Sequence, residues 1–94
     1  MLFRSLAKRV DANHPSVATA EFDLANVLRD SREFAEAETR YRHALQIRET
    51  ALGTSSPAVA EVLREYAKML RESGKAADAD QLEVRARTIT AAAK

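Results

Sequence analysis

The 94-residue chain has no cysteine and no tryptophan, and it has only two glycines and two prolines. The lack of cysteine excludes disulfide bonds and thiolate metal ligands. Because glycine and proline are the strongest helix breakers, their scarcity leaves few points at which a helix must end. A large net charge is missing too, since 15 Lys and Arg stand against 14 Asp and Glu. No general electrostatic field therefore attracts nucleic acid or an anionic membrane.

No apolar run approaches the roughly 18 residues needed to cross a bilayer. Abundant Ala, Leu, Glu and Arg favour helix instead, so we expect one small all-α domain. We expect a cytoplasmic protein, with one alternative. Residues 1–9 are basic, amphipathic and free of acids, as at the start of a mitochondrial presequence. Residues 3–7 also resemble 41–45, which favours a second interpretation, the second helix of an earlier, truncated repeat.

The chain repeats itself at an offset of 42 residues. Residues 13–52 align with 55–94 without a gap, and 12 of the 40 pairs are identical, among them Pro15 with Pro57 and Leu28 with Leu70. A period of this length is typical of stacked supersecondary units, each too small to bury its own apolar face. Such stacks offer surfaces rather than enclosed pockets, so the pattern predicts a binding function first.

Each copy contains two helical patterns. Pro15 and Pro57 follow polar clusters, which is a helix-start signal, and Ser73-Gly74 is a stop signal. Second helices run from Phe34 to near Gly53 and from Ala76 onward. The connections are only a few residues long, so each pair must be an antiparallel hairpin. The apolar periodicity predicts a core that contains Leu24, Leu28, Tyr41, Leu45, Tyr66 and Leu70.

These residues resemble the signature of the tetratricopeptide repeat. Leu24-Ala25, Leu28, Phe34, Ala37, Tyr41 and Ala44 follow its order and spacing, and the second copy offers Tyr66-Ala67, Leu70, Gly74, Ala77, Ala79 and Ala86. The 42-residue unit resembles the kinesin-light-chain type. Two departures are Arg32, where a turn glycine is usual, and Glu83, where the first copy has Tyr41.

The resemblance implies a right-handed α-solenoid of about five helices. Residues 1–12 would be a leading half-repeat helix, 13–54 the first full repeat, and 55–94 the second repeat with a C-terminal cap. A polar-backed cap is what repeat stacks require for solubility. The leading helix carries Leu2, Phe3, Leu6 and Val10 without a partner helix, so we also expect a weak homodimer through it.

Chemistry-bearing motifs are few. His14 precedes Pro15 and is interpreted as a helix cap, and His43 as a solvated or interfacial side chain. No zinc-binding His spacing, glycine-rich phosphate loop or nucleophile–base order is present. We therefore expect no catalytic residues, no metal, no cofactor and no enzyme activity.

A groove on the first helix of each unit is the candidate site, because the family resemblance assigns the concave side to these helices. Helical spacing places one set of polar side chains together there. The expected peptide-binding residues are Thr19, Phe22, Asp23, Asn26, Arg29, Arg64, Glu65 and Lys68, with Asp30, Glu61, Arg71 and Glu72 on the same face. Phe22 is out of register with the core pattern and is expected to be an exposed aromatic anchor.

Two functions remain open at this point. The first is a non-catalytic module that binds a protein or peptide of mixed charge in that groove. The second is a structural or self-assembling fragment of a longer array. A mass that rises with concentration in the absence of any partner would favour the second.

Overall fold

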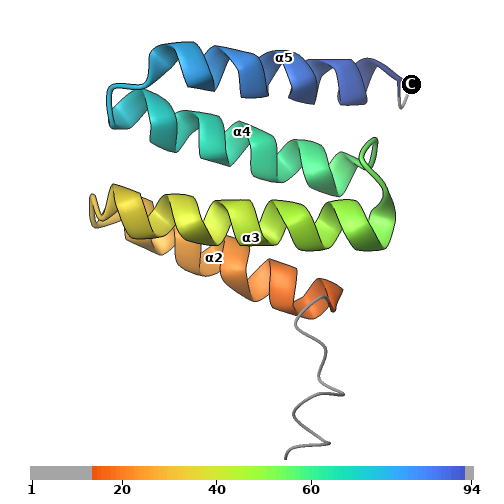
Figure 1. Ribbon diagram of the computed structural model, residues 1–94, viewed down its shortest axis with the longest axis horizontal. Helices are drawn as coiled ribbons and strands as arrows, with labels where there is room; N and C mark the ends of the chain where they lie inside the picture. Colours follow the sequence, from red (N-terminus) through yellow and green to blue (C-terminus); the bar gives the residue numbers. More distant parts are fainter. Residues whose placement is uncertain (1–13, 93–94) are drawn as a thin grey trace, which may run out of the picture.

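The computed structural model describes residues 14–92, which form four α-helices (Figure 1). They are α2 (Pro15–Asp30), α3 (Phe34–Leu52), α4 (Pro57–Glu72) and α5 (Ala76–Ala92). The helices pack as two antiparallel hairpins, α2 with α3 and α4 with α5. Helix α3 also packs on α4, whereas α2 and α4 touch only lightly. The all-α prediction is confirmed. The expected leading helix, 1–12, and the homodimer through it lie outside the described residues.

Side-chain caps begin both first helices, as the polar-then-proline pattern predicts. The Ser16 backbone N–H donates to His14 Nδ1 over 3.1 Å, and the Ala58 N–H donates to Ser56 Oγ over 3.2 Å. Each cap satisfies one backbone donor that the first turn leaves without a helical partner. The capping interpretation of His14 is therefore confirmed.

Left-handed residues form the turns within the hairpins. Gly74 has φ 89° between α4 and α5, and Arg32 has φ 63° at the equivalent point between α2 and α3. A non-glycine residue is uncommon in this region. The Arg32 guanidinium lies 5.2 Å from the centre of the Phe34 ring, a cation–π contact that offsets part of the backbone cost.

The core follows an aromatic row across three helices. The Phe22 ring meets the Tyr41 ring edge-on at 6.2 Å, and Tyr41 stacks on Tyr66 at 5.6 Å with 9° between the planes. Alanines allow the helices to approach closely around this row. Those that are fully or almost fully buried include Ala25, Ala37, Ala44, Ala67, Ala79 and Ala86.

Two of the burial expectations are wrong, and both concern α2. Leu24 is 39% exposed, although its counterpart Tyr66 is buried, because α3 covers that side of α4 and no helix of the described part covers the same side of α2. Phe22 is only 8% exposed, because it lies between Tyr41 and the side chain of Arg48. The other expected core residues are buried, apart from Leu45, which is half-buried against the core.

Candidate functional site

Carboxylates gather on the side of α2 and α4 that faces away from the core. On α2, Thr19, Asp23 and Asp30 are spaced at i, i+4 and i+11, which places them on one helical face. The same spacing places Glu61, Glu65 and Glu72 on one face of α4. We call these six residues the α2–α4 face. Glu65 is half-buried and the other five are exposed.

Arg29 joins the two helices at one end of this face. Its Nη1 donates to Glu65 Oε1 over 2.8 Å, and its Nε lies 3.6 Å from Asp30 Oδ1. Lys68 Nζ lies 3.3 Å from the other carboxylate oxygen of Glu65. Burial alone would raise the pKa of Glu65, but the hydrogen bonds from Arg29 and Lys68 outweigh it and lower the pKa. Glu65 is therefore an ionised bridge between the helices.

Arg48 joins them at the other end, reaching in from α3. Its side chain is almost fully buried and lies over the Phe22 ring, 5.1 Å from the centroid. Nη1 donates to the Ala58 carbonyl and to Glu61 Oε1, each over 2.9 Å, and Nη2 reaches Thr19 Oγ1 at 3.5 Å. One guanidinium thus contacts both sides of the α2–α4 face, which the planar fork of arginine allows.

The structure divides the expected binding residues into three groups by position: the α2–α4 face, a hollow between α4 and α5, and the pair Phe22 and Asn26, which contact Tyr41 of α3. Thr19, Asp23, Arg29 and Glu65 lie at or beside the α2–α4 face. Arg64 and Lys68 instead line a hollow between α4 and α5. The expectation that Phe22 is exposed is wrong, because the ring is buried between α2 and α3 and has no free face for a ligand.

Asn26 is half-buried and already has a partner. The Tyr41 hydroxyl donates to its side-chain carbonyl, Asn26 Oδ1. Burial raises the pKa of Tyr41 to about 12, so this hydroxyl stays protonated and remains the donor at neutral pH. The amide nitrogen of Asn26 is the part left for another contact.

The hollow between α4 and α5 has a volume of about 720 Å³. Arg64 Nη1 lies 3.5 Å from Thr90 Oγ1 across it, and Ala86 is buried in its lining. The residues that line it are Arg64 and Lys68 from α4, and Glu83, Ala86, Arg87 and Thr90 with Ala91 from α5.

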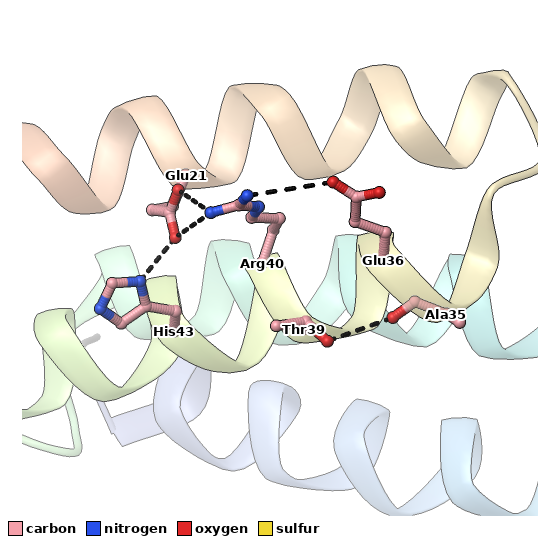
Figure 2. A network of polar contacts seen from close by, with 6 residues as sticks. All are labelled: Glu21, Ala35, Glu36, Thr39, Arg40 and His43. Carbon is pink, nitrogen blue, oxygen red and sulfur yellow. Dashed lines mark hydrogen bonds and ion pairs between the residues drawn. The ribbon is translucent and has the colours of Figure 1, made fainter.

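A second polar network joins α2 to α3 on another side of the hairpin (Figure 2). Glu21 accepts from Arg40 Nη1 over 3.1 Å, and His43 Nδ1 lies 2.5 Å from its other carboxylate oxygen. The side chain of Glu21 is 13% exposed. Burial would raise its pKa, but the hydrogen bonds from His43 and Arg40 prevail, and the pKa is lowered.

Arg48 and Glu21 are two polar residues whose roles the helical pattern does not predict. For both residues, the sequence signal is a difference in residue type between the two copies. Glu21 and Arg40 stand where the second copy has Leu63 and Leu82, which share one apolar cluster, so an apolar pair in one repeat is an ion pair in the other. Arg48 stands where the second copy has Thr90.

Metal and membrane features can be stated for residues 14–92. In that range no three His, Cys, Asp or Glu side chains come together in a way that could hold a metal ion. None of the helices α2 to α5 is long and apolar enough to cross a membrane.

Comparison with known proteins shows to which family the chain belongs. No curated protein matches it closely enough to be compared. A family model described as the tetratricopeptide repeat matches residues 16–92, which covers all four helices almost completely. The antiparallel hairpins, the close contacts at alanines and the 42-residue offset agree with that match. The chain therefore belongs to the tetratricopeptide repeat family.

Proposed function

We propose that this chain is a non-catalytic module that binds a peptide or helix of a protein partner on its α2–α4 face. Domains of this family are generally protein–protein interaction modules. The observation that carries the proposal is the charge of the face. Asp23, Asp30, Glu61 and Glu72 are exposed there, and Lys68, at its edge, is tied to Glu65.

This charge pattern refines the expected ligand. Arg29 and Arg48 are largely buried and hold acids of the face, so the charge left open toward a partner is negative. Charge complementarity then selects a segment with basic residues, and it acts on association rate and specificity more than on raw affinity. Because the face is small, the affinity should be micromolar.

Three finer features belong to the same proposal. The chain is of the kinesin-light-chain type, which the 42-residue offset and second helices as long as Phe34–Leu52 support. Its repeats run over 13–54 and 55–94, after a half-repeat at 1–12. The hairpins stack in the right-handed sense of an α-solenoid, with the α2–α4 face on the concave side.

Selection from a displayed library of random peptides tests the function. Peptides retained by the protein should be enriched in Lys and Arg, and calorimetry should find at least tenfold weaker binding to the variant D23K/E72K. Neither of these two acids makes an ion pair with another described residue, so their exchange should leave the fold intact.

The matched control is E33K/D78K, which inverts two exposed acids away from the face. It should bind the selected peptides as the parent does. Equal binding by D23K/E72K and the control would remove the site from this face.

Self-assembly is a second candidate, supported by an apolar strip on α2. Leu24 is 39% exposed and Val27 is 59% exposed, one helical turn apart. Sedimentation velocity of the parent beside L24S/V27S tests it. A parent mass that rises with concentration and a variant that stays monomeric would favour assembly through this strip.

A further inference from the structure

The hollow between α4 and α5 corresponds to a place where this fold already holds a helix. Subtracting 42 from its lining residues gives Phe22 and Asn26 on α2, and Tyr41, Ala44, Leu45, Arg48 and Glu49 on α3. Several of these side chains pack against α4, among them Leu45, which lies against the cluster of Val59 and Leu63. Tyr41 stacks on Tyr66, and Arg48 bonds the Ala58 carbonyl. The hollow therefore has the position and the backbone frame of a helix-binding groove.

The side chains of this second groove differ from the first. Arg64 replaces Phe22, Glu83 replaces Tyr41, and Arg87 replaces Leu45. The buried Ala86 is kept, as the counterpart of Ala44. The groove consequently keeps one small residue of the first, and it has charged residues where the first has Phe22, Tyr41 and Leu45. Long basic side chains still offer methylene stems for an apolar contact while their charges stay in water.

The charge of the hollow is positive. Its one acid, Glu83, is held by Arg71, whose Nη2 and Nε lie 2.6 and 3.1 Å from the two carboxylate oxygens. Those hydrogen bonds, partly opposed by burial, lower the pKa of Glu83 and keep it ionised and engaged. Within residues 14–92, Arg64 and Arg87 make no ion pair. Two cations are thus open toward a ligand, beside Lys68.

We infer that the α4–α5 hollow is a docking site for an acidic amphipathic helix of a protein partner. The lining of α5 extends from Glu83 to Ala91, about 12 Å at 1.5 Å per residue, which suits a partner helix of two to three turns. Its apolar side would lie over Ala86 and the methylene stems, and its carboxylates would meet Arg64 and Arg87. This surface differs from the α2–α4 face and takes a ligand of opposite charge.

A second copy of this chain fits the hollow less well. If α2 of another copy lay there as α4 lies on the first hairpin, Leu24 would stand on the charged Glu83, where Tyr66 stands on Tyr41. The ring stacking of Tyr66 on Tyr41 would have no equivalent there, and the apolar side chain would remove water from the ionised carboxylate at a cost in free energy. The charged lining therefore disfavours head-to-tail stacking and favours an acidic partner.

A peptide based on α4 is a suitable probe, because α4 is the helix that the first groove holds. Both probes have the sequence of residues 57–72 with Y66Q, which keeps an aromatic ring off Glu83. The acidic probe adds R64E, K68E and R71E, and it keeps Val59, Val62 and Met69. The basic control peptide has E61K, E65K and E72K instead. Both are labelled and blocked at their ends, and binding is followed by fluorescence anisotropy at low and at physiological salt.

The acidic probe should bind the parent, more tightly at low salt, and at least tenfold more weakly to the variant R64E/R87E. The matched control R32E/K75E, which inverts two basic residues at the hairpin turns, should bind as the parent does. The variant D23K/E72K should also bind the acidic probe normally, which separates this site from the α2–α4 face. If R64E/R87E does not fold, as judged by circular dichroism, R87A takes its place with a loss of at least threefold.

Three results would overturn the proposal. The first is failure of the acidic probe to bind the parent, or equal binding of the acidic and basic probes. The second is equal binding by R64E/R87E and R32E/K75E. The third is self-association of the parent, seen as a mass that rises with concentration, that is lost in both R64E/R87E and L24S/V27S. The hollow would then hold a second copy.

Discussion

Arg48 is a single side chain that joins three helices. It comes from α3, lies over Phe22 of α2, and bonds a backbone carbonyl and a carboxylate of α4. A buried charge is costly unless it is fully paired, so its partners must hold it in a defined geometry. The two helices themselves touch only lightly, so the orientation of α2 relative to α4 depends on this side chain together with the Arg29–Glu65 bridge.

Substitution R48A should destabilise the protein by about 1.5–3 kcal/mol, the range for lost hydrogen bonds to a charged group. The control R42A removes an arginine from the same helix whose side chain is mostly exposed; it pairs with Glu38 at 3.1 Å and donates to the Tyr66 hydroxyl over 3.0 Å. Its cost should be under about 1 kcal/mol. Urea unfolding curves of the two variants measure the difference, and equal losses would contradict the bridging role of Arg48.

Glu21 should make stability depend on acid pH. Its pKa is lowered in the folded state, so its contribution is present above the unfolded pKa of about 4.3 and is lost as pH falls through the folded value. The parent should therefore lose more stability than E21Q between about pH 5 and pH 3. Thermal melts across that range measure it.

E36Q is the control for this comparison, since Glu36 lies at the margin of the same network, 3.9 Å from Arg40, and its side chain is 56% exposed. Its curve should follow that of the parent. If E21Q lost stability with acid as steeply as the parent does, the network would not be responsible.

At the scale of the helix, α2 differs from α4 although the two share one pattern. Helix α4 is buried on two sides, by α3 and by α5, whereas α2 is covered by α3 and touches α4 only lightly. The apolar period predicts that a helix is amphipathic but not how many neighbours it has. That is why the burial of Leu24 is mispredicted, and why Phe22, which packs against Tyr41 and Arg48 of α3, is mistaken for an exposed residue.

Two leucines on α2 allow a direct test of how far each side of this helix is covered. Leu28 is 8% exposed, so L28A should cost about 2–5 kcal/mol, the range for a buried leucine. L24A should cost well under half as much, because Leu24 already contacts solvent. Unfolding midpoints in urea measure both. A cost for L24A as large as that for L28A would mean that another segment covers the outer side of α2.

Much of the element structure follows from local chemistry. The caps at His14 and Ser56 and the left-handed turn at Gly74 are all predicted from neighbouring residues alone. The candidate site is harder, because its bridges join residues such as Arg29 and Glu65, which are 36 positions apart. Periodicity places each on a face of its own helix, but only the packing of α2 beside α4 shows that they meet.

At the scale of the molecule, the α2–α4 face, which spans both hairpins, and the hollow of the second hairpin have opposite charge. The α2–α4 face is acidic, with its arginines turned inward, and the α4–α5 hollow is basic, with its acid held by Arg71. A net charge of +1 conceals this separation. Local rather than total charge therefore determines which partners the protein attracts.

The most direct test of the account is a nuclear magnetic resonance titration of the ¹⁵N-labelled protein with a basic peptide from the selection. The account predicts that the largest amide shift changes lie on the α2–α4 face, around Asp23, Glu61 and Glu72, and that the outer sides of α3 and α5 change little. Shift changes confined to α3 and α5, with none on that face, would contradict it.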